Sequence, residues 1–166
     1  ASREDYASGR LDAIPSSRLR WATRFTTDDS RSQSPEALKV FTFHETSRHY
    51  FLHNEAQFIQ SPSTIHTLRA GFSRVWNAKI SSQPPDVPAS MSFIPGQQLG
   101  YVRMTAGLTS IGGAPGESIS LLPRRFVIND FQYNYTLTSI RGMHALRMGG
   151  AFDRVHFNQR ADRNAK

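Results

Sequence analysis

Residues 126–138, FVINDFQYNYTLT, alternate between mainly apolar and mainly polar side chains. The odd-numbered positions hold Val127, Asn129, Phe131, Tyr133, Tyr135 and Leu137. The even-numbered positions hold Ile128, Asp130, Gln132, Asn134, Thr136 and Thr138. Successive side chains of a β-strand point to opposite faces, whereas a helix would spread these residues around its circumference. The segment therefore predicts a strand with two chemically distinct faces.

The same alternation recurs along the chain. In residues 18–25, RLRWATRF, one face would carry Leu19, Trp21, Thr23 and Phe25, and the other Arg18, Arg20, Ala22 and Arg24. Weaker versions occur at residues 6–14, 50–59, 65–75 and 145–157. No segment shows a convincing helical period. We therefore predict an all-β fold of about six antiparallel, up-and-down strands in one domain spanning residues 1–166.

The connections alternate between short and long. Residues 14–17, 60–64 and 139–143 are short and contain the Pro, Ser and Gly that tight turns require. Residues 27–47 and 76–125 are polar, and the second stretch is rich in Pro and Gly, so we predict two long loops. An up-and-down sheet then has its short turns at one end and its long loops at the other, as outer-membrane barrels do.

The two faces of these strands differ enough to suggest two environments. We predict that the apolar face contacts lipid, through Leu19, Trp21, Phe25, Phe131, Tyr133, Tyr135 and Leu137. We predict that the polar face lines a wet lumen, through Arg18, Arg20, Arg24, Asp130, Gln132 and Asn134. Antiparallel sandwiches with one face in water show similar alternation, so the pattern alone leaves a soluble sandwich open.

A double glycine, Gly149 and Gly150, interrupts the last predicted strand. Glycine inside a strand marks a bend, a bulge or a close approach by a neighbouring chain. We predict a strand bend or bulge, or such a close approach, at this point.

The chain is basic, with 20 Lys and Arg against 13 Asp and Glu, and all but three of the basic residues are arginine. Arginine binds carboxylate and phosphate groups, so anionic partners such as lipid headgroups or nucleic acid are conceivable. The arginines alternate with large apolar residues and form no continuous stripe with stacking aromatics. We therefore predict no nucleic-acid partner.

Residues that carry chemistry are sparse. There is no cysteine, and His49 and His53 would lie about 13 Å apart along one strand, too far to chelate one ion. No Ser/His/Asp set or carboxylate pair has a catalytic context. We predict no catalytic, cofactor or metal site, and no enzymatic activity.

The closing segments resemble TonB-dependent outer-membrane receptors, most closely the Oar-like group. The resemblance rests on residues 141–144 (RGMH), 145–154 (ALRMGGAFDR) and 157–159 (FNQ). Residues 58–74 (FIQSPSTIHTLRAGFSR) are similar to a hairpin of that family, and residues 20–29 (RWATRFTTDD) to a strand end. Residues 95–100 and 107–112 are similar to one of its loops. The resemblance implies a plug-gated barrel in the bacterial outer membrane that takes up a scarce solute.

The sequence departs from that family in two respects. No plug domain or TonB box is visible, and six strands are fewer than the eight of the smallest single-chain bacterial barrels. We therefore expect an internal part of a larger barrel, with outer-membrane lipid and the remaining barrel and plug segments as partners. The alternative is a structural or adhesive subunit that assembles with other copies or chains through its sheet edges. A carbohydrate-binding sandwich is a third possibility.

Overall fold

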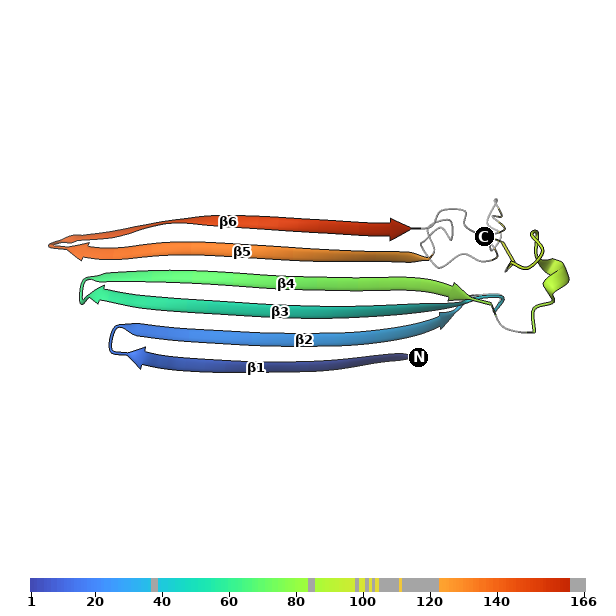
Figure 1. Cartoon of the computed structure of the whole chain (residues 1–166), viewed down its shortest axis with the longest axis horizontal. Coiled ribbons are helices and arrows are strands. Elements are labelled where there is room, and N and C mark those ends of the chain that lie inside the picture. Colours follow the sequence, from blue (N-terminus) through green and yellow to red (C-terminus); the bar gives the residue numbers. More distant parts are fainter. Residues whose placement is uncertain are drawn as a thin grey trace.

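The computed structural model describes residues 1–36, 39–83, 86–97, 99–100, 102, 104, 111 and 123–161. The strands form one sheet in chain order, each antiparallel to the next (Figure 1). They are β1 (Ser2–Ser16), β2 (Leu19–Pro35), β3 (Thr42–Ser61), β4 (Thr64–Ser82), β5 (Arg124–Arg141) and β6 (His144–Ala161). A short 3₁₀ turn, η1 (Ala89–Met91), precedes β5. The predicted all-β, up-and-down architecture is confirmed. No helix in the described part of the chain is long and apolar enough to cross a membrane.

Three two-residue turns join the strands into hairpins at one end of the sheet (Figure 1). Gly142 opens the last turn with a φ of 58°, a backbone conformation that favours glycine at the first central position of a hairpin turn. Arg18 lies in the first turn, since the pairing of β1 with β2 ends at Ser16 and Leu19. Its predicted place on a strand face is therefore wrong, because the chain reverses direction at this residue.

The predicted loop at residues 27–47 is also wrong. β2 and β3 stay paired from Thr27 and Tyr50 out to Pro35 and Thr42. The connection is only residues 36–41, closed by a hydrogen bond from the Glu36 amide to the Phe41 carbonyl (2.9 Å). Apart from Phe43, these strand ends are mostly polar on both faces, so backbone pairing continues where the alternation of side chains is lost.

The second predicted loop, residues 76–125, is real but shorter. β4 continues to Ser82 and β5 begins at Arg124, which leaves residues 83–123 as the connection. An isolated bridge joins Val102 to Ile111 within it. The loop motif at residues 107–112 lies largely outside the described residues.

The turn ends are staggered across the sheet. One row of paired residues crosses β2 to β6 through Leu19, Phe58, His66, Leu137 and Met148. The first hairpin turns at this row, the second continues to Ser61 and Thr64, and the third to Arg141 and His144. Closing a sheet into a barrel requires tilted strands and a progressive stagger in one direction. The register of these strands has that property.

The sheet is a single open layer with little buried apolar surface. Tyr133 and Phe152 are 48% and 61% exposed, and the described core consists of Phe41, Phe43 and Leu99. A sandwich would bury one face of each strand against a second sheet. The described strands form no second layer, so the sandwich alternative is wrong for this chain.

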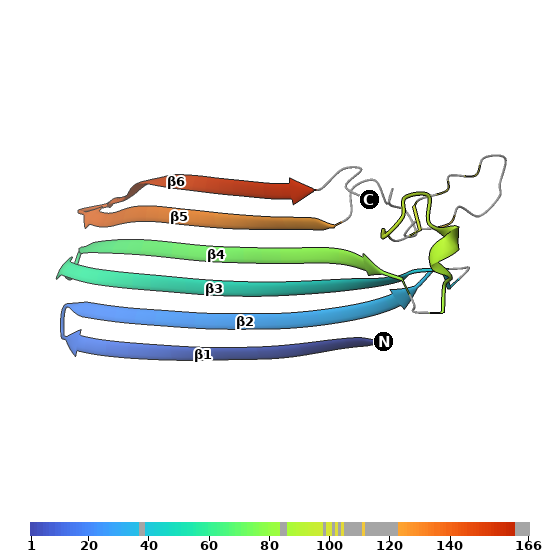
Figure 2. The same cartoon turned by 45° about the vertical axis from the view of Figure 1, so that its right-hand side comes forward.

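The double glycine allows a close approach between β5 and β6. The pairing of the two strands runs from end to end without a register shift, so the predicted bulge is absent. A Cβ atom at Gly149 would overlap the Tyr135 carbonyl oxygen and press on the Thr136 Cα, whereas a Cβ at Gly150 would meet open space. Figure 2 shows β6 curving near its turn. Gly149 is therefore the position that the local backbone geometry requires to be glycine.

We expect Gly149→Ala to destabilise the folded protein by about 1–3 kcal/mol, because the added methyl group must push β5 and β6 apart. Gly150→Ala is the matched control and should leave stability unchanged within about 1 kcal/mol. The urea midpoint of each variant, measured on the full-length protein in detergent, checks this. Equal midpoints for the two variants would contradict the close-approach explanation.

Candidate functional site

The strand register sorts the predicted site residues onto the two faces of one sheet. Directly paired residues of antiparallel strands share a face. Both tryptophans lie on the same face, called here the tryptophan face, together with Leu19, Phe25, Phe131, Tyr133, Tyr135 and Leu137. The opposite face carries Arg20, Arg24, Asp130, Gln132 and Asn134. The two predicted sets are therefore separated, while the surroundings of each face stay a prediction.

An apolar band crosses the tryptophan face in the half of the sheet nearest the turns. Its members on β2 and β3 include Leu19, Trp21, Phe25, Leu52, Ala56 and Phe58. On β4 to β6 they include Leu68, Phe72, Phe131, Tyr133, Leu137, Leu146, Met148 and Phe152. The band is not uniformly apolar, because Thr23 and Asn54 pair within it.

Aromatic pairs join neighbouring strands along this band. The rings of Phe72 and Phe131 lie 5.1 Å apart between β4 and β5, and those of Tyr133 and Phe152 lie 6.4 Å apart between β5 and β6. The Tyr135 hydroxyl is hydrogen-bonded to Nδ1 of His66 (2.7 Å). Such cross-strand pairs contribute roughly 0.2–1 kcal/mol each to sheet stability.

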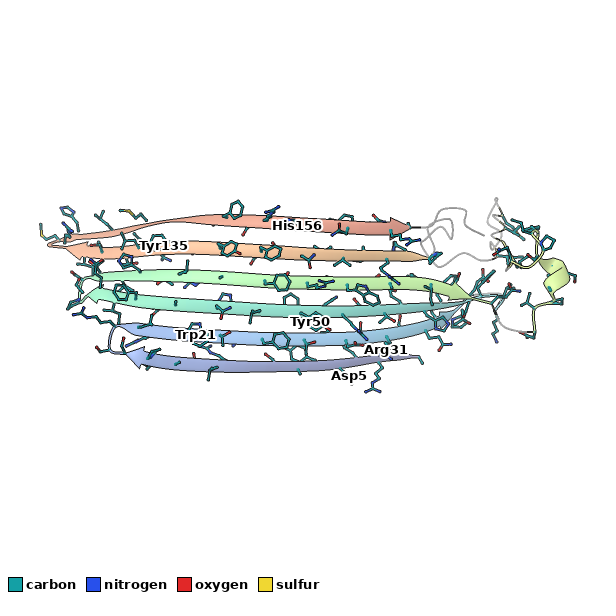
Figure 3. The ribbon with its side chains drawn as sticks, viewed as in Figure 1. Asp5, Trp21, Arg31, Tyr50, Tyr135 and His156 are labelled. Carbon is teal, nitrogen blue, oxygen red and sulfur yellow. The ribbon has the colours of Figure 1, made fainter. Side chains whose placement is uncertain are left out.

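Beyond the band, the tryptophan face becomes charged. Asp29 accepts a hydrogen bond from Arg48 Nε (2.7 Å) and lies 3.5 Å from Arg31 Nε. The guanidinium groups of Arg48 and Arg125 each lie 5.9 Å from the Trp76 ring. Figure 3 shows Trp21 and Tyr135 toward the turns, and Asp5 and Arg31 toward the other end.

The opposite face is polar in the half nearest the turns. Arg69 donates a hydrogen bond to Glu55 (2.7 Å), and Gln132 donates one to Asp130 (2.8 Å). Arg10 forms an ion pair with Asp12 (2.7 Å). A shallow depression in this region is lined by Arg10, Ala22, Thr23, Arg24, His53 and Glu55. These groups are suited to a solvated surface that binds polar solutes or ions.

Farther from the turns, the opposite face of β3 to β6 gains apolar residues. They include Phe51, Val75, Phe126, Ile128, Val155 and Phe157. Phe43, on the same face of β3, is 1% exposed because Phe41 and Leu99 pack with it. The Leu99 amide also donates to the Gln83 side chain within the long connection (2.7 Å), and the packing of Leu99 against Phe43 holds the connection to this face. On β3 to β6, apolar residues thus pass partly to the opposite face about halfway along the strands, where that face still carries Glu45 and Lys79.

The sequence itself indicates this change, although an interpretation with one apolar and one polar face per strand does not detect it. Phe126 and Ile128 belong to the even-numbered set of their segment, whereas Phe131, Tyr133 and Tyr135 belong to the odd-numbered set. A change of apolar parity within one strand marks a change of surroundings along it.

Groups of three or more potential metal ligands are absent from the described residues. The sequence-based expectations of no metal, no cofactor and no catalysis stay predictions.

The sheet is a single-layer meander with short turns at one end, a staggered register and two chemically different faces. These features together are those of the wall of a membrane β-barrel. The chain matches the family described as outer membrane beta barrel domain over residues 1–166, and it belongs to that family. Its location is accordingly an outer membrane. No curated protein and no solved structure matches the chain.

We expect Phe43→Ala to release the long connection from the sheet. Truncating a buried Phe typically costs about 3–5 kcal/mol, and here the loss falls on the contact with Leu99. Added protease should cleave within residues 83–123 faster than in the unmodified protein. Phe51→Ala is the control, because Phe51 lies on the same face of β3 but is 43% exposed. Similar cleavage rates in both variants would contradict the anchoring role of Phe43.

Proposed function

We propose that this chain forms part of the barrel wall of a TonB-dependent transporter in the bacterial outer membrane, which takes up a scarce solute. The apolar band contacts lipid, and the opposite face lines a water-filled lumen. The chain carries out no catalysis and holds no cofactor or metal. The observation that carries the proposal is the change of the tryptophan face from apolar to charged about halfway along the strands.

Strand length gives this change a physical meaning. A tilted strand crosses a bilayer with about 9–11 residues. β3 has 20 residues, and from Tyr50 to Phe58 its tryptophan face carries no charged residue. The remainder of β3 exceeds what lipid can cover. Water then contacts the tryptophan face there, which accounts for Asp29, Arg31 and Arg48.

The opposite face, which the proposal assigns to the lumen, has two features that favour transport over a purely structural role. Leu99 of the long connection packs against Phe43 at the loop end of β3, on the face that the proposal assigns to the lumen. Nearer the turns, the same face carries polar side chains such as Arg24, His53 and Glu55. In a barrel, a loop at this end of the strands would stand at the entrance of the lumen, and loops held by a rigid scaffold commonly carry binding residues. The similarity of residues 141–159 to TonB-dependent receptors points in the same direction.

The second candidate is a structural or adhesive subunit that assembles through strand edges. It is favoured by β1 and β6, each of which pairs with a single strand in this sheet. Unpaired edges of this length promote pairing with further strands. In the transporter these further strands complete the same barrel, and in the structural subunit they belong to other copies.

We expect Leu68→Arg to hinder membrane assembly of the full-length protein. Leu68 lies in the apolar band, where an arginine near mid-bilayer costs about 2–4 kcal/mol. Thr67→Arg is the matched control, because Thr67 is the preceding residue and faces the other side. Folding into lipid vesicles, followed by the mobility of unheated protein on gels, checks this. Equal losses for both variants would refute the assignment of the tryptophan face to lipid.

We expect cells with the full-length protein to accumulate a solute that cells without it do not. The uptake should stop when a protonophore removes the inner-membrane energy source, because plug-gated uptake depends on it. Mass spectrometry of cells grown in a mixture of scarce solutes would measure this. Extracellular polymers of the protein, without energy-dependent uptake, would support the structural subunit instead.

A further inference from the structure

The charges of β3 to β6 are distributed unequally between the two faces. All residues of these strands are described, and their acidic residues, Glu45, Glu55, Asp130 and Asp153, lie on the opposite face. On the tryptophan face of the same strands there is no Asp or Glu to neutralise the arginines. The tryptophan face of β3 to β6 therefore presents net positive charge, although the neighbouring β2 contributes Asp29 beside Arg48.

The arginines occupy a defined position relative to the apolar band. From the band toward the loop end, the first charged side chain on each of β3 to β6 is an arginine. These four residues, called here the basic belt, are Arg48, Arg74, Arg125 and Arg154. Trp76 lies within the belt, with Arg48 and Arg125 each 5.9 Å from its ring. Tryptophan beside an apolar band is typical of the level where lipid headgroups begin.

We propose that the basic belt binds the phosphate groups of lipid headgroups in the membrane leaflet nearest the loop end. The inference rests on the proposed contact of the tryptophan face with lipid. The four arginines lie on successive rows, from Arg154, paired with Phe131 at the edge of the band, through Arg74 and Arg48 to Arg125. A phosphorylated lipid places its chains on the band and its phosphate at that edge, nearest Arg154 and Arg74. Arginine forms paired, charge-assisted hydrogen bonds with phosphate oxygens. Arg48 and Arg125 are also within cation–π range of Trp76.

Arg74 and Arg154 are the most available members of the belt. Both lie on the tryptophan face and have no acidic partner among the described residues. Arg48, in contrast, already donates to Asp29 (2.7 Å). Lipid phosphates would supply the counter-charge that this part of the sheet lacks.

The test uses the full-length protein in phosphatidylcholine vesicles. The protein carries Trp21→Phe, so that Trp76, which lies within the belt, is the tryptophan of this segment that transfers energy. Energy transfer from tryptophan to a lipid that carries its label on an acyl chain is measured at small mole fractions of labelled phosphatidic acid or labelled phosphatidylcholine. The same measurement on a Trp21→Phe/Trp76→Phe protein gives the background from other tryptophans. We expect labelled phosphatidic acid to be enriched around Trp76 over labelled phosphatidylcholine.

The enrichment should fall by about fivefold or more in Arg74→Gln/Arg154→Gln, since each arginine near an anionic surface contributes about that factor. Arg24→Gln/Arg147→Gln removes two arginines from the opposite face and should leave the enrichment unchanged. High salt should reduce it in the unsubstituted protein, which tests the belt without relying on any variant.

The possible outcomes distinguish a failure of the proposed phosphate-binding belt from a failure of the proposed lipid contact. If Trp76 transfers energy equally to both labelled lipids, the belt does not prefer the anionic phosphate monoester of phosphatidic acid to the choline-capped phosphate of phosphatidylcholine, and the proposed belt is overturned, although the tryptophan face still contacts lipid. If Trp76 transfers to neither, the lipid contact itself is refuted. Loss of the enrichment on adding inorganic phosphate at low millimolar concentration would identify a site for free phosphate and overturn the lipid assignment.

Discussion

Antiparallel pairing of the backbone is the constraint on which the rest of this structure depends. Every strand is joined to its neighbour along nearly its whole length, and this continuous ladder fixes which side chains share a face. In lipid such a ladder is obligatory, because an unpaired backbone amide or carbonyl costs several kcal/mol. A sheet held in this way needs little apolar core of its own, and Phe41, Phe43 and Leu99 form a very small one.

Side-chain chemistry then varies along the ladder without disturbing it. Near the turns the tryptophan face is apolar and the other face is polar, while toward the loops apolar residues appear on the other face. The backbone is paired in the same way in both halves. The position of this change therefore reports the surroundings of the sheet, and the basic belt lies where those surroundings change. Membership of the outer membrane beta barrel family is consistent with both halves of this pattern.

Strands could be predicted from the sequence where apolar and polar side chains alternate strongly, and they were missed where this alternation is weak. The strand in FVINDFQYNYTLT was found because Phe131, Tyr133 and Tyr135 lie against short polar residues. The strand ends at residues 27–35 and 42–47 were missed, because their side chains, apart from Phe43, are mostly polar on both faces and resemble a loop while the backbone stays paired. The charged half of the tryptophan face was missed for the same reason. The role of Gly149 required coordinates, since only they show the Tyr135 carbonyl against it.

The unequal connections also have a kinetic consequence. Each hairpin closes through a two-residue turn, whereas β4 and β5 can pair only after residues 83–123 bring their ends together. Closing the longer loop costs roughly 2–3 kcal/mol more in chain entropy, and non-local pairing is slow for that reason. The β5–β6 hairpin can thus form as a separate unit and join the other four strands late. The contact between Phe72 and Phe131 lies across that last seam, where assembly of the wall is completed.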